Sequence, residues 1–146
     1  MQEIAERLKA KGLKVGEDLK IVVPASKIKE EARKVRDVGY DHVKSVTGID
    51  YPHDGVFKII YHVSSYSDRQ LSKSILTIEV EISRDNPQIP SLIDIWPSVK
   101  YLEAETSELF GIEFQGNSLK KVMLPEDFEG FPLRRDFKIP VEGIEK

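Results

Sequence analysis

Three stretches of the chain repeat their hydrophobic residues at helical spacing. We predict helices over residues 2–11, 26–38 and 98–110, each with an apolar stripe on one side and charged residues on the other. Ser26 is positioned to cap the second helix, whose stripe consists of Ile28, Ala32, Val35 and Val38. Glycine often follows a helix end, and the residues that close these helices are Gly12, Gly39 and Gly111.

Four other stretches are typical of strands, because they are rich in β-branched residues or alternate hydrophobic with polar side chains. They span residues 19–23, 42–49, 56–63 and 74–83. One face of the third strand carries Phe57, Ile59, Tyr61 and Val63. In the fourth strand the inward set is Leu76, Ile78, Val80 and Ile82, and the outward set is Thr77, Glu79 and Glu81.

The order of these elements predicts an α+β fold. Short connections join the last three strands, so we expect an antiparallel sheet with the helices packed on one face. The chain has 146 residues and neither an internal repeat nor a linker, which favours a single domain. We divide that domain into an α+β core, residues 1–112, and an extended, irregular C-terminal arm, residues 113–146.

The arm follows neither a helical nor a strand pattern. Glycine and proline interrupt it at Gly116, Pro125, Gly130 and Pro132, yet it is rich in large apolar side chains. These are Phe114, Leu119, Val122, Met123, Leu124, Phe128, Phe131, Leu133 and Phe137. A solvated tail is rarely so apolar, and irregular backbone needs partners for its N–H and C=O groups. We interpret the arm as a docking segment; the alternative is that it wraps back onto its own sheet.

Charge and composition exclude several classes of protein. The formal net charge of −3 provides no basic field for nonspecific binding of nucleic acid or of an anionic membrane. Cysteine is absent, so the chain cannot hold a thiolate-bound zinc ion or a cysteine-ligated iron–sulfur cluster. We expect no cofactor. No run approaches the roughly 18 apolar residues of a membrane span, and the N-terminal segment is unlike a secretory signal, so we expect a cytoplasmic location.

The candidate catalytic and metal-binding residues are few. His42, His53 and His62 are scattered over predicted strands and a turn, where structural or surface roles are the rule. Asp50, His53 and Asp54 form the nearest metal-like group, but they lie in a turn whose backbone they can also hydrogen-bond. A small enzyme that uses Asp50, His53 and His62 therefore stays an alternative, and so does a homodimeric interaction domain.

Two charged groups near the arm have two interpretations each. Glu103, Glu105 and Glu108 lie toward the C-terminal end of a helix, where the helix dipole disfavours them. They form either a solvated face or a group that an external cation neutralises. Arg134 and Arg135 either make a surface ion pair with the adjacent Asp136 or reach the carboxylates of a partner.

The region that contains these residues resembles a known family. The string "IPSLIDIWPSVKYLEAETSELFGIEFQGNSLKKVMLPEDFEGFPLRRDF" is similar to the signature region of the thirty-kilodalton subunit of respiratory complex I, the NADH-quinone oxidoreductase. The upstream strings "VTGIDYP" and "FKIIYHVSS" resemble the same family, so the likeness covers about residues 41–140. This family also supplies subunits to archaeal cofactor-linked dehydrogenases and membrane-bound hydrogenases.

The resemblance implies a noncatalytic subunit in the peripheral arm of an ion-pumping oxidoreductase such as NADH:quinone oxidoreductase. Its implied partners are the large catalytic subunit, a homologue of the hydrogenase large subunit, and adjacent iron–sulfur subunits. Its implied location is the cytoplasmic face of the membrane, reached through the complex. We expect the partner-binding residues to be Glu105, Glu108, Phe110, Phe128, Phe131, Leu133, Arg134, Arg135 and Asp136.

The chain departs from the family pattern at several positions. Ala104 and Ser107 replace the usual arginine and aromatic residue, Phe131 replaces a histidine, and the turn at residues 116–118 is shorter. These differences favour a divergent branch, such as an archaeal membrane-bound hydrogenase or a related complex.

Overall fold

The structure is a computed structural model that describes residues 2–119, 122, 124 and 128–138. The helices are α1 (Gln2–Ala10), α2 (Ile28–Val38) and α3 (Val99–Phe110). The strands are β1 (Lys20–Val22), β2 (His42–Tyr51), β3 (Val56–Ser64), β4 (Leu76–Ser83), β5 (Gln88–Pro90) and β6 (Glu113–Gln115). Single 3-10 turns lie at Glu17–Leu19, Ala25–Lys27 and Leu71–Lys73. The predicted helices and strands are thus confirmed, with small shifts at their ends.

The main sheet has four strands in the order β1-β4-β3-β2. Strands β2, β3 and β4 form the predicted antiparallel meander. Strand β1 is added parallel to β4, with Ile21 opposite Ile78, which makes the sheet mixed. A parallel neighbour needs a long crossover, and here α2, β2 and β3 lie between the two strands in the sequence.

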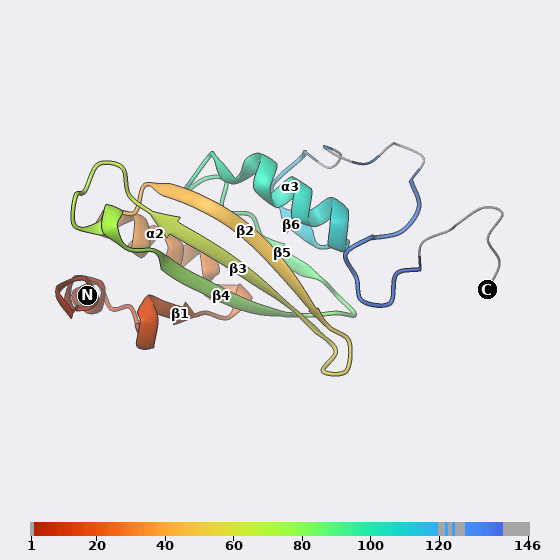
Figure 1. The fold of residues 1–146 in the computed structure, drawn as a ribbon, viewed down its shortest axis with the longest axis horizontal. Coiled ribbons are helices and arrows are strands. Elements are labelled where there is room, and N and C mark those ends of the chain that lie inside the picture. The colour runs from red at the N-terminus through yellow and green to blue at the C-terminus, as the bar shows by residue number, and fades with distance from the viewer. Residues whose placement is uncertain (1, 120–121, 123, 125–127, 139–146) are drawn as a thin grey trace.

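One face of the sheet carries the core. The predicted inward residues of β3 and β4 are all buried, and they join side chains of α1, α2 and α3 in one hydrophobic cluster. The helices therefore cover this face, as predicted, with α1 and α2 toward one end of the sheet and α3 toward the other (Figure 1). Burying a large aliphatic or aromatic side chain contributes about 1.5–3 kcal/mol each, so this shared face holds the layers together.

The opposite face of the sheet carries charged and polar side chains. Glu79 points to this face, as predicted, and its carboxylate lies 2.8 Å from the Lys20 ammonium and 3.7 Å from that of Lys58. Glu79 is nevertheless only 9% exposed. Ser45 and His62 are hydrogen-bonded at 2.9 Å on neighbouring strands.

The start of α2 differs from the prediction. Ser26 lies in the 3-10 turn Ala25–Lys27, and the residue that precedes α2 is Lys27, without a side-chain hydrogen bond to the helix. The helix ends are as predicted: Gly39 and Gly111 follow α2 and α3 with positive φ angles of 132° and 77°, a region that favours glycine.

A small parallel sheet of β5 and β6 was not predicted. Each strand has three residues, with Ile89 opposite Phe114. Phe114 is 1% exposed, so the first residues of the segment that we assigned to the arm pack with the core. We call residues 128–138 the outer arm.

Candidate protein–protein interface

The carboxylate of Glu103 fastens α3 to three other segments. Its side chain is fully buried. It accepts hydrogen bonds from the Tyr61 hydroxyl at 2.8 Å, the Leu92 N–H at 2.9 Å, the Asn117 side-chain amide at 3.2 Å and the Ser91 hydroxyl. Glu103 therefore connects α3 with β3 and with the residues that follow β5 and β6.

Burial sets the protonation behaviour of this group. Burial raises the pKa of the Glu103 carboxyl, and the hydrogen bonds from Leu92, Ser91, Tyr61 and Asn117 offset only part of that effect. Burial also raises the pKa of Tyr61 well above its ordinary value, and the adjacent Glu103 carboxylate raises it further. The tyrosine hydroxyl therefore stays protonated and available as a donor.

Glu108 holds the part of the arm that precedes the outer arm. Its carboxylate accepts the N–H groups of Val122 at 3.2 Å and Leu124 at 3.0 Å, and the residue is 6% exposed. Of the two interpretations of this acidic group, the solvated face is wrong for Glu103 and Glu108, because both residues are buried and accept hydrogen bonds from the protein. Glu105 is exposed.

A second buried carboxylate, Asp50 of β2, attaches the outer arm to the sheet. Asp50 is 3% exposed and makes a two-pronged ion pair with Arg84, whose Nε and Nη2 lie 2.8 and 3.1 Å from its two carboxylate oxygens. The Arg135 N–H donates to the Asp50 carboxylate at 2.9 Å, and the Arg135 Nε donates to the Asp50 carbonyl at 3.1 Å. Arg84 also pairs with Asp136 at 3.0 Å. We call these four residues the Asp50 cluster.

The charges in the Asp50 cluster stabilise the ionised carboxylate. Burial by itself would raise the pKa of Asp50, but the hydrogen bonds from Arg84 and the Arg135 N–H, together with the charges of Arg84 and Arg134, lower it below its ordinary value. The hydrogen bonds to Asp50 and Asp136 raise the pKa of Arg84. Both shifts favour the ionised form of the Asp50–Arg84 pair.

Arg134 packs the outer arm against the C-terminal end of α3. Its Nε donates to the Phe110 carbonyl at 2.7 Å, and its guanidinium lies 5.2 Å from the centre of the Phe57 ring and 4.7 Å from that of Phe131. A Cβ atom at Gly111 would lie 2.7 Å from the Phe131 ring and 2.8 Å from Arg134. Only glycine allows this close approach, so Gly111 serves both the helix end and the attachment of the arm.

The outer arm also carries apolar side chains at the surface. Leu133 is 52% exposed and Phe131 is 39% exposed. Phe128 is half-buried and stacks on Phe137 with ring centres 6.0 Å apart. The outer arm thus has two sides. Polar contacts attach one side to the core, and the other side exposes apolar side chains to solvent.

The structure brings most of the predicted partner-binding residues into one region. Glu105, Phe131, Leu133, Arg135 and Asp136 are exposed, whereas Phe128 and Arg134 are half-buried. Phe110 and Glu108 are each 6% exposed. The Phe110 ring meets Phe57 edge-to-face with ring centres 6.1 Å apart, and therefore supports the region from beneath.

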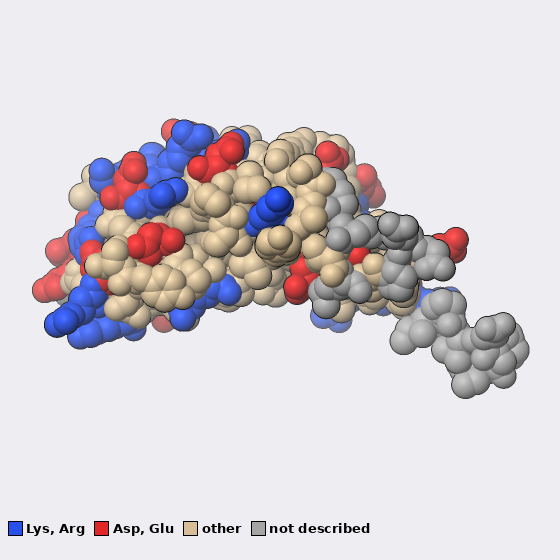
Figure 2. All heavy atoms as spheres, turned by 90° about the horizontal axis from the view of Figure 1, so that it is seen from above, with Lys and Arg blue, Asp and Glu red and all other residues tan. Residues whose placement is uncertain are grey.

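Next to the outer arm lies an open pocket of about 630 Å³, between the end of α3 and the start of β6. Its walls include Phe128, Phe131, Glu108 and Glu113. In a view from above, the middle of the visible surface is mostly uncharged, whereas charged side chains of both signs gather at one end of the molecule (Figure 2). A weakly charged surface beside exposed aromatic residues is typical of the centre of a protein interface.

The candidate metal and catalytic residues do not form a site. Within the described residues, no three of the His, Asp and Glu side chains are close enough to hold a metal ion. Asp50 is engaged by arginines, His53 and Asp54 are exposed in the hairpin turn, and His62 is hydrogen-bonded to Ser45.

Sequence reasoning missed the structural roles of Asp50, Arg84 and Glu103. A signal for Asp50 existed: in β2 it stands two residues after Gly48, opposite Phe57, at a position where strand alternation points inward. A charge at an inward position predicts a buried partner, but no pattern in the sequence identifies Arg84 and the outer arm as that partner.

Comparison with known proteins then identifies the family. The family model "Respiratory-chain NADH dehydrogenase, 30 Kd subunit" matches residues 21–142. The chain belongs to this family. The resemblance predicted from the sequence is therefore confirmed, and the match extends beyond it to include α2 and most of β1.

Relatives within this family come from bacteria and archaea. The chain is 35% identical over 132 residues to a subunit of the NADH-quinone oxidoreductase of Roseiflexus castenholzii, covering 87% of this chain and 74% of the relative. It is 32% identical over 123 residues to a subunit of the F(420)H(2) dehydrogenase of Methanosarcina mazei, covering 82% and 75%.

A solved structure has the same fold. It is the trypsin-resistant fragment (1-134) of Nqo5, with a TM-score of 0.65, 27% identity, and coverage of 80% of this chain and 96% of the fragment. In the part of our chain that the structure describes, no helix has the length and hydropathy of a membrane span.

Proposed function

We propose that the chain is a noncatalytic subunit in the peripheral arm of a complex I-like, membrane-associated oxidoreductase. In this role it packs on the large catalytic subunit, a homologue of the hydrogenase large subunit, next to iron–sulfur subunits. It scaffolds electron transfer that is coupled to ion pumping. Family membership supports this role, as do the names of the relatives in Roseiflexus castenholzii and Methanosarcina mazei.

The observation that carries the proposal is the two-sided outer arm. Its polar groups are used inside the chain, where Arg134 binds the Phe110 carbonyl and Arg135 binds Asp50. Its apolar residues Phe131 and Leu133 nevertheless remain 39% and 52% exposed. A partner can bury apolar and aromatic side chains on such a pre-organised segment without first ordering its backbone, which lowers the entropy cost of binding.

The arginines then have a different role from the one expected from the sequence. We propose that Arg134 and Arg135 act mainly by positioning the outer arm, and that Phe131 and Leu133 supply most of the contact energy with the large subunit. Phe128, Glu105 and Asp136 border this contact. Glu108 and Phe110 hold it from beneath. The chain reaches the cytoplasmic face of the membrane through these partners.

Co-purification of Leu133→Asp with the large subunit tests this function. A carboxylate in the desolvated contact is expected to weaken binding at least tenfold, which corresponds to about 1.4 kcal/mol. The matched control is Tyr66→Asp, which changes an 81% exposed aromatic residue on the loop after β3 and is expected to bind normally. If Leu133→Asp and Tyr66→Asp both co-purify with the large subunit as well as the unaltered protein does, the outer arm is excluded as the interface.

The parent complex has two candidate electron donors. The relative in Methanosarcina mazei is named as part of an F(420)H(2) dehydrogenase, and its identity of 32% is close to that of the NADH-quinone oxidoreductase relatives. We keep the archaeal type of complex as the second candidate. Assaying the purified complex with NADH and with reduced F420 separates the two. A homodimer found by size-exclusion chromatography, with no bound large subunit, would favour the interaction-domain alternative.

A further inference from the structure

The free edge of β1 offers backbone groups for pairing. Among the described strands, β1 is the outermost strand of the sheet and lies next to β4. The Val23 N–H donates to the Glu79 carbonyl at 2.9 Å, whereas the Lys20 carbonyl turns away from β4 and accepts the Gly16 N–H at 2.8 Å. Alternation along the strand therefore points the N–H and C=O of Val22 away from β4. The Val22 side chain is 66% exposed.

A pocket of about 590 Å³ lies against this edge, between β1 and the segment that follows α1. Apolar side chains of Leu13, Val15 and Val22 line it. Its remaining side chains are the lysines Lys9, Lys14 and Lys20. The pocket thus combines an apolar surface with a cationic rim.

The rim has an excess of positive charge. No Asp or Glu is among the described residues that line the pocket. Lys20 is paired with Glu79, but Lys58 shares that carboxylate. Lys9 and Lys14 are exposed, and no ion pair joins either to a carboxylate in the described part of the chain. A ligand with carboxylates would be complementary to this rim.

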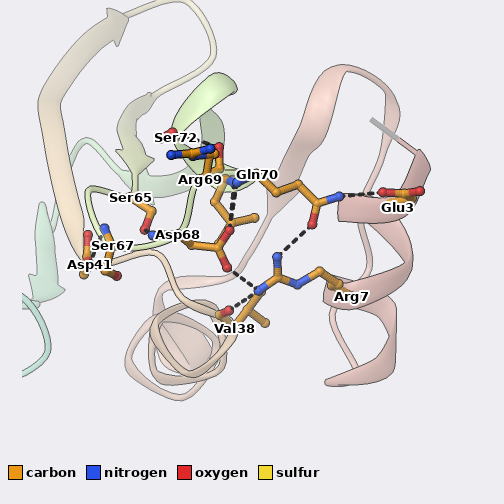
Figure 3. Close-up of polar contacts among 11 residues, drawn as sticks. Glu3, Arg7, Val38, Asp41, Ser65, Ser67, Asp68, Arg69, Gln70 and Ser72 are labelled. Carbon is orange, nitrogen blue, oxygen red and sulfur yellow. Dashed lines mark hydrogen bonds and ion pairs between the residues drawn. The ribbon is translucent and has the colours of Figure 1, made fainter.

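The wall that carries Lys9 is fixed in place. Two residues earlier in α1, the Arg7 guanidinium donates to the Val38 carbonyl and to Asp68, both at 2.8 Å, and to Gln70 at 2.9 Å (Figure 3). The hydrogen bond to Asp68 raises the pKa of Arg7, and the same contact lowers the pKa of Asp68. Helix α1 is therefore attached to the end of α2 and to the loop after β3, so this wall of the pocket is pre-organised for a ligand.

We propose that the β1 edge and this lysine-rimmed pocket bind an extended, acidic segment of a neighbouring subunit. The segment adds to the sheet beside Val22, places an apolar side chain in the pocket and brings carboxylates to Lys9 and Lys14. Addition of a strand to a free sheet edge takes affinity from main-chain hydrogen bonds and specificity from the pockets beside it. Pro24 ends the edge, and the Lys20 carbonyl already accepts the Gly16 N–H. The paired stretch is therefore short, and the lysines supply most of the selectivity.

Titration of the full chain with a synthetic peptide tests the site directly. The probe is acetyl-Glu-Val-Glu-Val-Glu-amide, followed by NMR at low salt on the ¹⁵N-labelled protein. We expect saturable shifts of the Val22 amide and of its neighbours, and slower hydrogen exchange of that amide. The peptide with lysine in place of glutamate is expected to cause none of these changes.

Charge variants test the role of the lysines. Lys9→Glu with Lys14→Glu is expected to weaken binding of the acidic peptide at least tenfold. The control is Lys44→Glu with Lys73→Glu, which changes two exposed lysines on β2 and in the turn after β3 by the same total charge. If both double variants weaken peptide binding equally, the effect is one of net charge alone and the proposal is overturned. An absence of peptide-induced shifts of the Val22 amide would also overturn it.

Cross-linking in the complex separates this inference from the proposed function on which it rests. A photoreactive residue at position 22 is expected to cross-link to an acidic, extended segment of another subunit, and one at the exposed position 47 to give no such product. Co-purification without a cross-link at position 22 would overturn the inference and leave the proposed function intact. Failure of co-purification would overturn the proposed function, and the peptide titration would still decide whether the edge binds an acidic segment.

Discussion

Two buried carboxylates hold the candidate interface in place, and they differ in how they are compensated. Asp50 is surrounded by arginines, which lower its pKa. Glu103 is surrounded by neutral donors, and burial raises its pKa. Removing a partner from either group leaves a buried polar atom unsatisfied, which costs about 1–3 kcal/mol per group. At this scale, stability depends on which donors face each oxygen.

Glu103→Gln is expected to reveal the raised pKa through its pH dependence. The folded state binds the Glu103 proton more tightly than the unfolded state does, so this group stabilises the fold at low pH. The contribution is lost as pH rises from the unfolded pKa of about 4.3 through the raised folded pKa. The unfolding free energy of the unaltered protein, minus that of Glu103→Gln, should therefore be larger at pH 4.5 than at pH 7. Urea unfolding at both values measures it.

Glu103→Ala serves as the reference for the hydrogen bonds themselves. It leaves the Tyr61 and Ser91 hydroxyls and the Leu92 N–H without their acceptor and should cost about 3 kcal/mol or more, which exceeds the cost of Glu103→Gln. A difference between the unaltered protein and Glu103→Gln that grows with pH would mean that the carboxyl is ionised more easily in the fold than in the unfolded chain.

At the scale of elements, the local patterns predicted the parts that are long and amphipathic. The stripe of α2 and the alternation of β3 and β4 appear in the structure as the buried faces that they predicted. The parallel addition of β1 and the pairing of β5 with β6 had no local signal, because three residues are too few for a period and the partners lie far apart in the chain. The same reason explains why the buried role of Glu103 could not be predicted from the sequence: its hydrogen-bond donors come from segments that only the fold brings together.

The outer arm is the element whose attachment is most easily tested. Asp50→Asn removes the charge that pairs with Arg84 and accepts the Arg135 N–H, so the outer arm should open more often. We expect amide exchange of Leu133, whose N–H donates to the Leu109 carbonyl at 3.0 Å, to become at least tenfold faster, corresponding to about 1.4 kcal/mol. Exchange of Ile59 in the middle of β3 is the internal control.

The effect of Asp50→Asn should depend on pH in the direction opposite to that of Glu103→Gln. Because the folded pKa of Asp50 is lowered, its contribution is present above the unfolded pKa of about 3.9 and is lost as pH falls through the folded value. The stability difference between Asp50→Asn and the unaltered protein should therefore shrink in acid. A difference that is constant with pH would show that the Asp50 charge does not hold the outer arm.

At the scale of the whole molecule, the core and the outer arm differ in how they are stabilised. The core is one hydrophobic cluster to which all three helices contribute. The outer arm is attached through Arg134, Arg135 and the close contact at Gly111. One side of the outer arm therefore packs onto the core of its own chain, as one interpretation of the sequence held, while the other side leaves Phe131 and Leu133 exposed, as the proposed docking role requires.

A chain that ends at Leu119 tests both halves of this description. It keeps every helix and strand of the described residues, so it should fold cooperatively and keep the near-ultraviolet circular dichroism of Trp96, which is 2% exposed. Loss of the contacts of Arg134 and Arg135 should cost about 2–4 kcal/mol and lower the melting temperature by roughly 5–15 °C. Binding to the large subunit should be abolished.

Leu133→Asp provides the comparison, because it should weaken binding while leaving the melting temperature nearly unchanged. A truncated chain that binds normally would place the interface outside the outer arm, and one without near-ultraviolet signal would make the arm part of the core.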